Sequence, residues 1–103
     1  MAQKIALKVD PKDNVATVFA DDVKDQSTLD LYDKKGFVEV ITVYGDVPYG
    51  HKIAVQDIAQ GEHIIKYGEI IGAATTNICC GEYVHIHNLD ALRGRGDLEG
   101  EKR

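Results

Sequence analysis

Two histidines one residue apart, in the sequence GEYVHIHN at positions 81–88, are the first candidates for chemistry. The alternation of apolar and polar residues indicates a strand, so Tyr83, His85 and His87 would share one face. The two histidines would lie about 6.5 Å apart along the strand and could bind one transition metal ion, given a third ligand. In isolation, the solvent-facing side of a sheet explains the pair better, and Asn88 could simply end the strand.

Further polar candidates follow turns elsewhere in the chain. His51 and Lys52 come directly after the turn of residues 48–50, where a loop can present side chains to a cleft; the alternative is a solvated strand start. Lys66 could bind a carboxylate, while the neighbouring Tyr67 is of a type more often found in a core. In RGRGD (93–97), two arginines could clamp a carboxylate, but a tail that orders against a partner is the favoured interpretation.

The two cysteines, Cys79 and Cys80, are neighbours. Adjacent cysteines form a disulfide only with strain, and two ligands are too few for a structural zinc site. The sequences IAQGEHI (58–64) and ICCGEYV (78–84) are similar, which predicts two equivalent turns with a Gly at positive φ before a strand. The cysteines occupy the places of Ala59 and Gln60, so they are interpreted as small turn residues.

The elements that must position these residues are short strands. Apolar residues recur in brief runs or by twos, they are rich in Val, Ile, Tyr and Thr, and turn residues separate them. This pattern predicts a small all-β domain. The polar segment 21–36 is expected to be irregular apart from a short strand at 29–32. The runs are KIALKV, NVATVFA, FVEVITVY, HKIAV, HIIKY, EIIGAAT and YVHIH.

Length and charge limit the classes of function. The 103 residues fit one domain, and the net charge of −5 comes from 17 acidic and 12 basic residues spread evenly along the chain. This balance argues against nucleic acid or an anionic membrane as a partner. No segment approaches the ~18 apolar residues of a membrane span, and the amino-terminal segment lacks a signal-peptide pattern. A soluble, cytoplasmic protein is expected.

The segment VPYGHKIAVQDIAQGEHIIKYGEIIGAATTNICCGEYVHIHN (47–88) resembles the SAF domain of the altronate and galactarate dehydratases, lyases that remove water from six-carbon sugar acids. The earlier DPKDNVATV looks like the opening of the same family. The resemblance implies a β-clip fold, a compact arrangement of short strands. The HIHN ending is similar to altronate-type and sulfolactate-type small subunits, and LRGRGDL (92–98) to altronate-type stand-alone small subunits.

The resemblance implies a single SAF domain over 1–103, with its core motif at 47–88 and a mobile or partner-binding tail at 89–103. It implies the small subunit of an altronate-type dehydratase, working with a separate large catalytic subunit on a sugar acid. The alternatives are a sulfolactate sulfo-lyase small subunit and a non-catalytic carbohydrate-binding module. A divalent metal (iron, manganese or magnesium) is expected in the assembled enzyme, and a homo-oligomer stays open. The implied site residues are His51 and Lys52 for catalysis, Lys66, Tyr67 and Asn88 for substrate, and His85 and His87 for metal.

Overall fold

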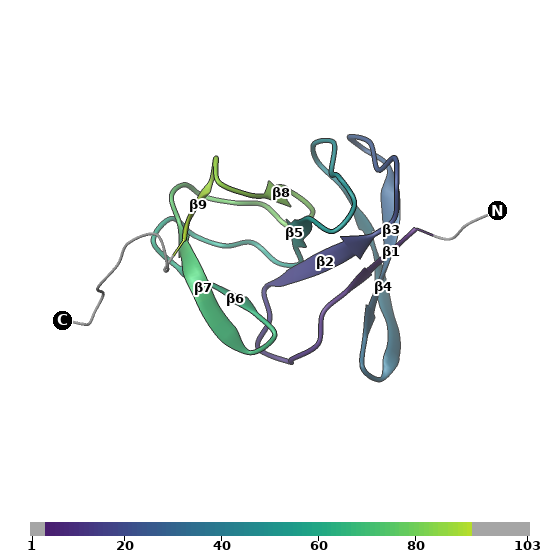
Figure 1. The fold of residues 1–103 in the computed structure, drawn as a ribbon, viewed down its shortest axis with the longest axis horizontal. Coiled ribbons are helices and arrows are strands. Elements are labelled where there is room, and N and C mark those ends of the chain that lie inside the picture. The colour runs from purple at the N-terminus through teal and green to yellow at the C-terminus, as the bar shows by residue number, and fades with distance from the viewer. Residues whose placement is uncertain (1–3, 92–103) are drawn as a thin grey trace.

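The structure is a computed structural model that describes residues 4–91 (Figure 1). Within these residues the chain forms strands joined by turns, and none of it forms a helix, which confirms the predicted all-β class. None of the described segments is a helix of the length and hydropathy that crossing a membrane needs. The strands are β1 (Ile5–Leu7), β2 (Val15–Phe19), β3 (Thr28–Asp33), β4 (Gly36–Thr42), β5 (Lys52–Ala54), β6 (His63–Lys66), β7 (Glu69–Ala74), β8 (Tyr83–Val84) and β9 (Leu89–Ala91).

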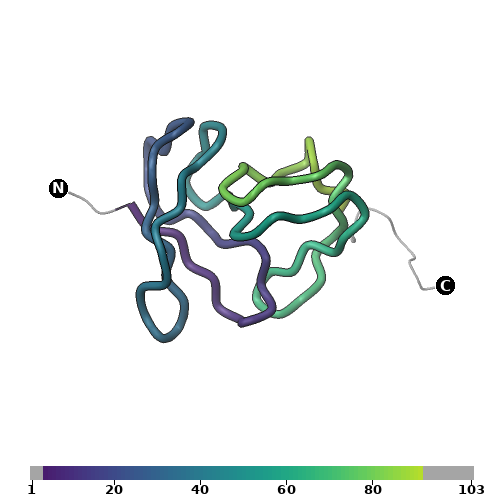
Figure 2. The backbone as a smooth tube through the Cα atoms, turned by 180° about the vertical axis from the view of Figure 1, so that it is seen from behind, coloured from purple at the N-terminus to yellow at the C-terminus, as the bar shows by residue number. Residues whose placement is uncertain are grey.

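The strands form two sheets. The six-stranded sheet has the order β4-β3-β1-β2-β5-β8, in which only β1 and β3 run parallel among the described strands. The three-stranded sheet has the antiparallel order β6-β7-β9. Figure 2 shows the amino-terminal strands on one side of the molecule and the green and yellow carboxyl-terminal strands on the other. Strands β5 and β8 lie at one end of the larger sheet; Lys52 begins β5, His51 directly precedes it, and His85 directly follows β8.

Each side of the molecule has its own apolar core. One cluster of buried residues lies under the first strands and includes Val18, Leu31 and Ile53. The other lies between the two sheets and includes Ile58, Ile64 and Val84. Alternation along short strands sends neighbouring residues to different clusters, so β5 contributes Ile53 to the first and Ala54 to the second. Strand β5 is thus held on both faces, which fixes the residues just before it.

Two buried polar residues tie the sheets together. The side chain of Asn14 accepts a hydrogen bond from Ile65 N–H (2.7 Å) and donates one to the His63 carbonyl (2.9 Å). Asp13, only 1% exposed, accepts bonds from three backbone N–H groups, those of Val9, Asp10 and Gly68. Burial alone would raise the pKa of Asp13, but the backbone donors together lower it. Sequence reasoning assigned no role to either residue.

A five-residue turn of one design occurs four times. In each copy the N–H of the fifth residue donates to the carbonyl of the second, and the fourth residue has a positive φ. The first and second turns are bridged by Val23 and Val47, and the third and fourth by Ile58 and Ile78. The first to fourth turns span 23–27, 47–51, 58–62 and 78–82, with φ of 71° at Gln26, 82° at Gly50, 88° at Gly61 and 93° at Gly81.

The third and fourth turns confirm the equivalence that the sequence similarity predicted. In both, the glutamate at the fifth position accepts a hydrogen bond from the N–H of the second residue. In both, an Asp or Asn from before the partner turn accepts from the N–H of the third residue. These bonds are Ala59 N–H to Glu62 Oε1 (2.6 Å), Cys79 N–H to Glu82 Oε1 (2.9 Å), Gln60 N–H to Asn77 Oδ1 (2.8 Å) and Cys80 N–H to Asp57 Oδ1 (2.9 Å).

Two expectations about element boundaries need correction. Strand β8 ends at Val84, and residues 85–88 form a turn because the Asn88 amide satisfies the backbone there. The tail was expected from residue 89, yet Leu89–Ala91 is strand β9 paired with β7. The segment 21–36 is as expected, since β3 at Thr28–Asp33 covers the short strand predicted at 29–32 and the residues before it are irregular. The arginine-rich sequence 93–97 lies outside the described residues.

Candidate functional site

The site is built around a contact between His51 and Tyr83. The Tyr83 hydroxyl lies 2.8 Å from Nδ1 of His51, within hydrogen-bond distance. The His85 ring stacks nearly parallel to the Tyr83 ring, at 7° and 5.7 Å between centroids, and lies 4.8 Å from the His51 ring. The His87 ring is 5.5 Å from that of Tyr83. Three histidines from two distant parts of the sequence therefore gather around one tyrosine.

Lys52 approaches this group from the other side of strand β5. Lys52 is paired with Thr17 on one side and Val84 on the other, so all three side chains leave the sheet on the same face. Tyr83 is paired with Ile53 and leaves on the opposite face. The sequence GHK thus does not place His51 and Lys52 side by side. Both nevertheless act electrostatically on His85, because β8 is short and the chain turns immediately after it.

Lys66 and Tyr67 border the site at the turn between β6 and β7. Tyr67 is 48% exposed with φ of 55°, and its hydroxyl lies 3.3 Å from Oγ1 of Thr17. The Lys66 ammonium lies 5.1 Å from the centre of the Tyr67 ring, in cation–π range. Thr17 also pairs with Lys52, so Tyr67 brings the β6–β7 turn next to the face that carries Lys52. Tyr67 is therefore a surface residue beside the lysines and not a core residue.

The charges that shift the pKa values of His85 and Lys52 are positive. Partial burial lowers the pKa of His85, and the charges of His51, Lys52 and His87 lower it further. Burial also lowers the pKa of Lys52, with an added contribution from the Lys66 ammonium. Among residues 4–91, no carboxylate contributes to either shift. An anion bound here would favour the protonated form of both groups, so this location suits a negatively charged ligand.

Asn88 holds the backbone of the site in place. It is 1% exposed; its amide oxygen accepts from the N–H of His85 (2.9 Å), and its amide nitrogen donates to the Tyr83 carbonyl (2.9 Å). These bonds fold residues 85–88 back on themselves and place His85 against Tyr83. The structure thus gives Asn88 a clear positioning role, and its contact with substrate stays a prediction.

Residues 4–91 do not by themselves make a complete metal site. Within the described part of the chain, no group of three or more His, Cys, Asp or Glu side chains could hold a metal ion. Nδ1 of His51 is engaged by Tyr83, which leaves His85 and His87 without a third ligand from residues 4–91. A metal on these two histidines would need ligands from another chain, and that role stays a prediction.

The second turn differs from its counterparts in a way that bears on His51. His51 stands at the fifth position, where the third and fourth turns have the capping glutamates Glu62 and Glu82. The second position of this turn is Pro48, which has no N–H to be capped. The fifth side chain is therefore not needed to complete the turn, and the imidazole of His51 turns to Tyr83 instead.

The cysteines lie on a different recess, lined by Tyr44, Asp57, Cys79, Cys80 and Glu82. Both are free thiols. Burial raises the pKa of Cys80, and the nearby carboxylates of Glu39 and Asp57 raise it further. A thiol held in its protonated form is a poor nucleophile and a poor metal ligand. The geometry agrees with the interpretation of the cysteines as turn residues.

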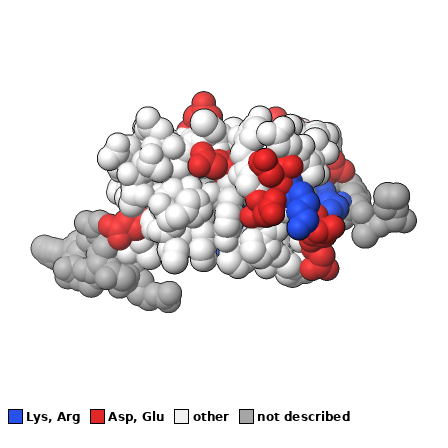
Figure 3. All heavy atoms as spheres, turned by 90° about the horizontal axis from the view of Figure 1, so that it is seen from above, with Lys and Arg blue, Asp and Glu red and all other residues white. Residues whose placement is uncertain are grey.

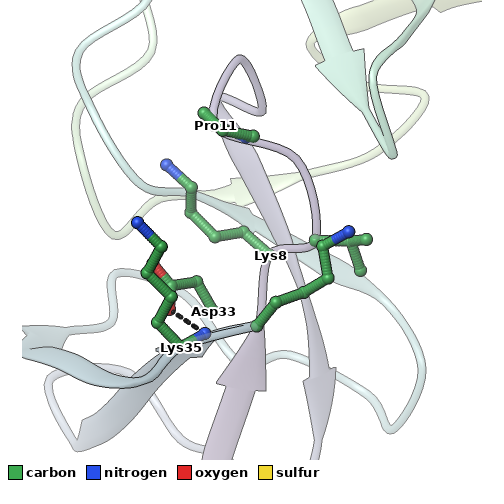
Figure 4. Close-up of a pocket in the computed structure, with 6 residues that line it drawn as sticks. Lys8, Pro11, Asp33 and Lys35 are labelled. Carbon is green, nitrogen blue, oxygen red and sulfur yellow. Dashed lines mark hydrogen bonds between the residues drawn. The ribbon is translucent and has the colours of Figure 1, made fainter.

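Two other charged surfaces lie elsewhere on the molecule. Figure 4 shows a recess near the β3–β4 turn in which Lys8 and Lys35 direct their amines into the same space, with Asp33 beside them. It lies on the side of the molecule away from β8 (Figure 1). Figure 3 shows charges of both signs gathered at one end of the face seen from above. The recess has no histidine among its lining residues, unlike the region of His51 and His85.

Tyr83 is the site residue that sequence reasoning missed. The strand alternation did place it on the face of the histidines, but no role followed from that. Its contact with His51 spans 32 positions in the sequence and depends on β5 pairing with β8. The strand alternation was the available signal, and the partner could come only from the sheet order.

Comparison with known proteins agrees with this geometry. Residues 4–92 match the family model of the altronate/galactarate dehydratase SAF domain. The chain is 40% identical over 100 residues to altronate dehydratase of Escherichia coli (strain K12), covering 90% of this chain and 19% of that protein. It is 38% identical over 53 residues to (2R)-sulfolactate sulfo-lyase subunit alpha of Paracoccus pantotrophus, covering 52% of this chain and 79% of that subunit.

The altronate dehydratase relatives are much longer than the region they share with this chain, which spans about a fifth of the Escherichia coli protein and 16% of the Bacillus subtilis (strain 168) one. The matched region includes β1 to β9 and with them every residue of the site described above. The fold, the site and the match over nearly all described residues lead to one conclusion: this chain belongs to the altronate/galactarate dehydratase SAF domain family.

Proposed function

We propose that this chain is the small subunit of an altronate-type dehydratase, which eliminates water from a 2,3-dihydroxy acid together with a separate large catalytic subunit. The observation that carries the proposal is the positive local charge around His85 and Lys52 in a chain whose net charge is −5. Such a location favours a carboxylate, and the neighbouring histidines offer groups for proton transfer.

In this proposal the lysines bind the substrate carboxylate and His51 takes part in the elimination. A base removes the proton next to the carboxylate, the bond from the adjacent carbon to its hydroxyl breaks, and an acid protonates the leaving hydroxyl to give water. Lys52 and Lys66 stabilise the negative charge that develops on the carboxylate. Tyr67 packs beside Lys66 and would contact the substrate from the same side.

The remaining groups are assigned to the large subunit. The altronate dehydratase relatives are more than five times as long as the shared region, which supports a larger catalytic part. A divalent metal, when bound in the assembled enzyme, would supply the electrophile for the carboxylate. His85 and His87 could contribute two ligands from this chain, and the large subunit would have to supply the others.

Reconstitution tests the proposal. The chain, its large partner and their mixture are each assayed for water elimination from altronate, with and without Lys66→Ala. The mixture should be active, the separate chains should not, and Lys66→Ala should raise KM at least ~10-fold through the loss of a charged hydrogen bond. Lys34→Ala, at an exposed lysine on the other recess, is the matched control. Full activity of the isolated chain would overturn the two-subunit assignment.

A sulfolactate sulfo-lyase small subunit is the second candidate. It is favoured by the match to 79% of the Paracoccus pantotrophus subunit. The same positive site would accept a substrate with both a carboxylate and a sulfonate. Sulfite release from sulfolactate in the mixture, without elimination from altronate, would select this candidate. Saccharide binding with no activity in either assay would instead indicate a non-catalytic module.

A further inference from the structure

The contact of Tyr83 with His51 is rigid at both ends. Tyr83 lies in β8, its N–H donates to the Tyr44 carbonyl (3.2 Å), and its ring packs against the first apolar cluster. His51 donates its N–H to the Pro48 carbonyl (3.1 Å) and accepts at its own carbonyl from Val18 N–H (2.8 Å). Backbone hydrogen bonds therefore hold both residues in place, which keeps the His51 ring within reach of the Tyr83 hydroxyl.

The chemistry of the two groups determines which of them donates. A phenol is a good hydrogen-bond donor, and the unprotonated imidazole nitrogen is a better acceptor than a phenol oxygen. The favoured arrangement therefore has the Tyr83 O–H donating to Nδ1, which leaves the proton of neutral His51 on Nε2. Nε2 has no hydrogen-bond partner within residues 4–91.

We propose that Tyr83 is a positioning residue that keeps His51 a hydrogen-bond donor at Nε2. In neutral His51 the Tyr83 hydroxyl occupies Nδ1, and in the protonated form Nδ1–H donates to the Tyr83 oxygen. Nε2 carries a proton in both states. His51 thus donates to an oxygen of the substrate and does not remove the α-proton. This inference rests on the proposed role of His51 in the elimination.

Nitrogen NMR of the isolated full chain tests the contact without any activity. In a sample with ¹⁵N-labelled histidine above pH 8, His51 should show its proton on Nε2 and an Nδ1 signal shifted by an accepted hydrogen bond. Tyr83→Phe, which keeps the ring and removes the hydroxyl, should move the Nδ1 signal and leave that of His63 unchanged. A proton on Nδ1 in the wild type, or an unmoved Nδ1 signal in the variant, would overturn the proposal.

Kinetics of the reconstituted enzyme test the consequence for catalysis. Tyr83→Phe should lower kcat about 10-fold with KM within twofold, as expected for the loss of one neutral hydrogen bond. In the His51→Ala background the same change should have no further effect, because Tyr83 acts through His51. Tyr44→Phe, at an exposed tyrosine, is the control for loss of a phenol hydroxyl.

The two proposals fail in different ways. A His51→Ala variant with undiminished turnover would contradict the proposed function while the NMR result could still stand. A strong effect of His51→Ala, combined with additive losses from Tyr83→Phe, would contradict the positioning role and leave the proposed function intact.

Discussion

The second turn (47–51) and the third turn (58–62) have the same backbone design but different uses of the fifth side chain. In the third turn Glu62 completes the turn by accepting from Ala59 N–H. In the second turn Pro48 presents no N–H, and His51 at the fifth position meets Tyr83. Because Pro48 has no N–H to be capped, the side chain of His51 is not needed to complete the turn and can take part in chemistry. The difference shows how one repeated turn can be either a structural element or part of a site.

The largest expected effect is on stability, and it differs between a glycine substitution in the fourth turn and the same substitution in the third. At Gly81 an added Cβ would overlap the carbonyl oxygen of Thr42, whereas at Gly61 it would meet open space. Both positions have positive φ, so alanine is strained at each. Gly81→Ala should lower the free energy of unfolding by about 3 kcal/mol and Gly61→Ala by about 1 kcal/mol. Urea unfolding measures both, and equal losses would show that the close approach to Thr42 is not rigid.

The next largest effects come from replacing the fifth residue of the second turn, and that of the third turn, by alanine. His51→Ala should reduce turnover of the reconstituted enzyme about 100-fold and change stability by less than about 0.5 kcal/mol. Glu62→Ala at the equivalent position should do the reverse, with about 1 kcal/mol of stability lost and turnover within twofold. Steady-state kinetics and urea unfolding of both variants decide. A turnover within twofold of wild type for His51→Ala would remove His51 from the chemistry.

Converting the second turn into the third tests the role of Pro48. Pro48→Ala should cost about 0.5–1 kcal/mol, because the unfolded chain becomes more flexible and the new N–H has no capping carboxylate. Adding His51→Glu should recover about 1 kcal/mol through the same bond that Glu62 makes. If His51→Glu stabilised the chain that retains Pro48 by the same amount, the gain would not come from capping an N–H at position 48. The comparison between the two turns would then be wrong.

The smallest effect concerns the pH dependence of stability. The pKa of His85 is lowered in the folded chain from its ordinary value of 6.5, so the unfolded chain binds the proton more readily. Stability from this source is complete above pH 6.5 and is lost as the pH falls towards the folded-state pKa. His85→Gln should reduce the acid sensitivity between pH 7.5 and 5.5 by less than about 0.5 kcal/mol, since His85 is partly exposed. Thermal unfolding across that range provides the measurement, with His63→Gln as the control. Unchanged acid sensitivity in His85→Gln would show that His85 does not cause the loss of stability at low pH.

Local pattern predicted the strands and the similar turns, but it failed where a side chain competes with the sheet. Alternation through GEYVHIHN indicated one continuous strand, and only the two hydrogen bonds of Asn88 end it at Val84. In the polar segment 21–36 the predicted strand at 29–32 is confirmed, and β3, paired with β1 and β4, exceeds it by one residue at each end. The first and second turns went unrecognised because Gln26, Ser27 and His51 replace the Gly and Glu residues that the third and fourth turns share.

The sequence by itself determined the all-β class, the equivalence of the third and fourth turns and the family, because these depend on residue types and near-neighbour spacing. It also named His51, Lys52, Lys66 and His85 as candidates. Only the tertiary structure decided that His51 joins Tyr83 while Lys52 leaves β5 on the other face, beside Lys66 and Tyr67. Those contacts join positions far apart in the chain, and sheet order and register, which follow from packing of the whole chain, determine which side chains meet.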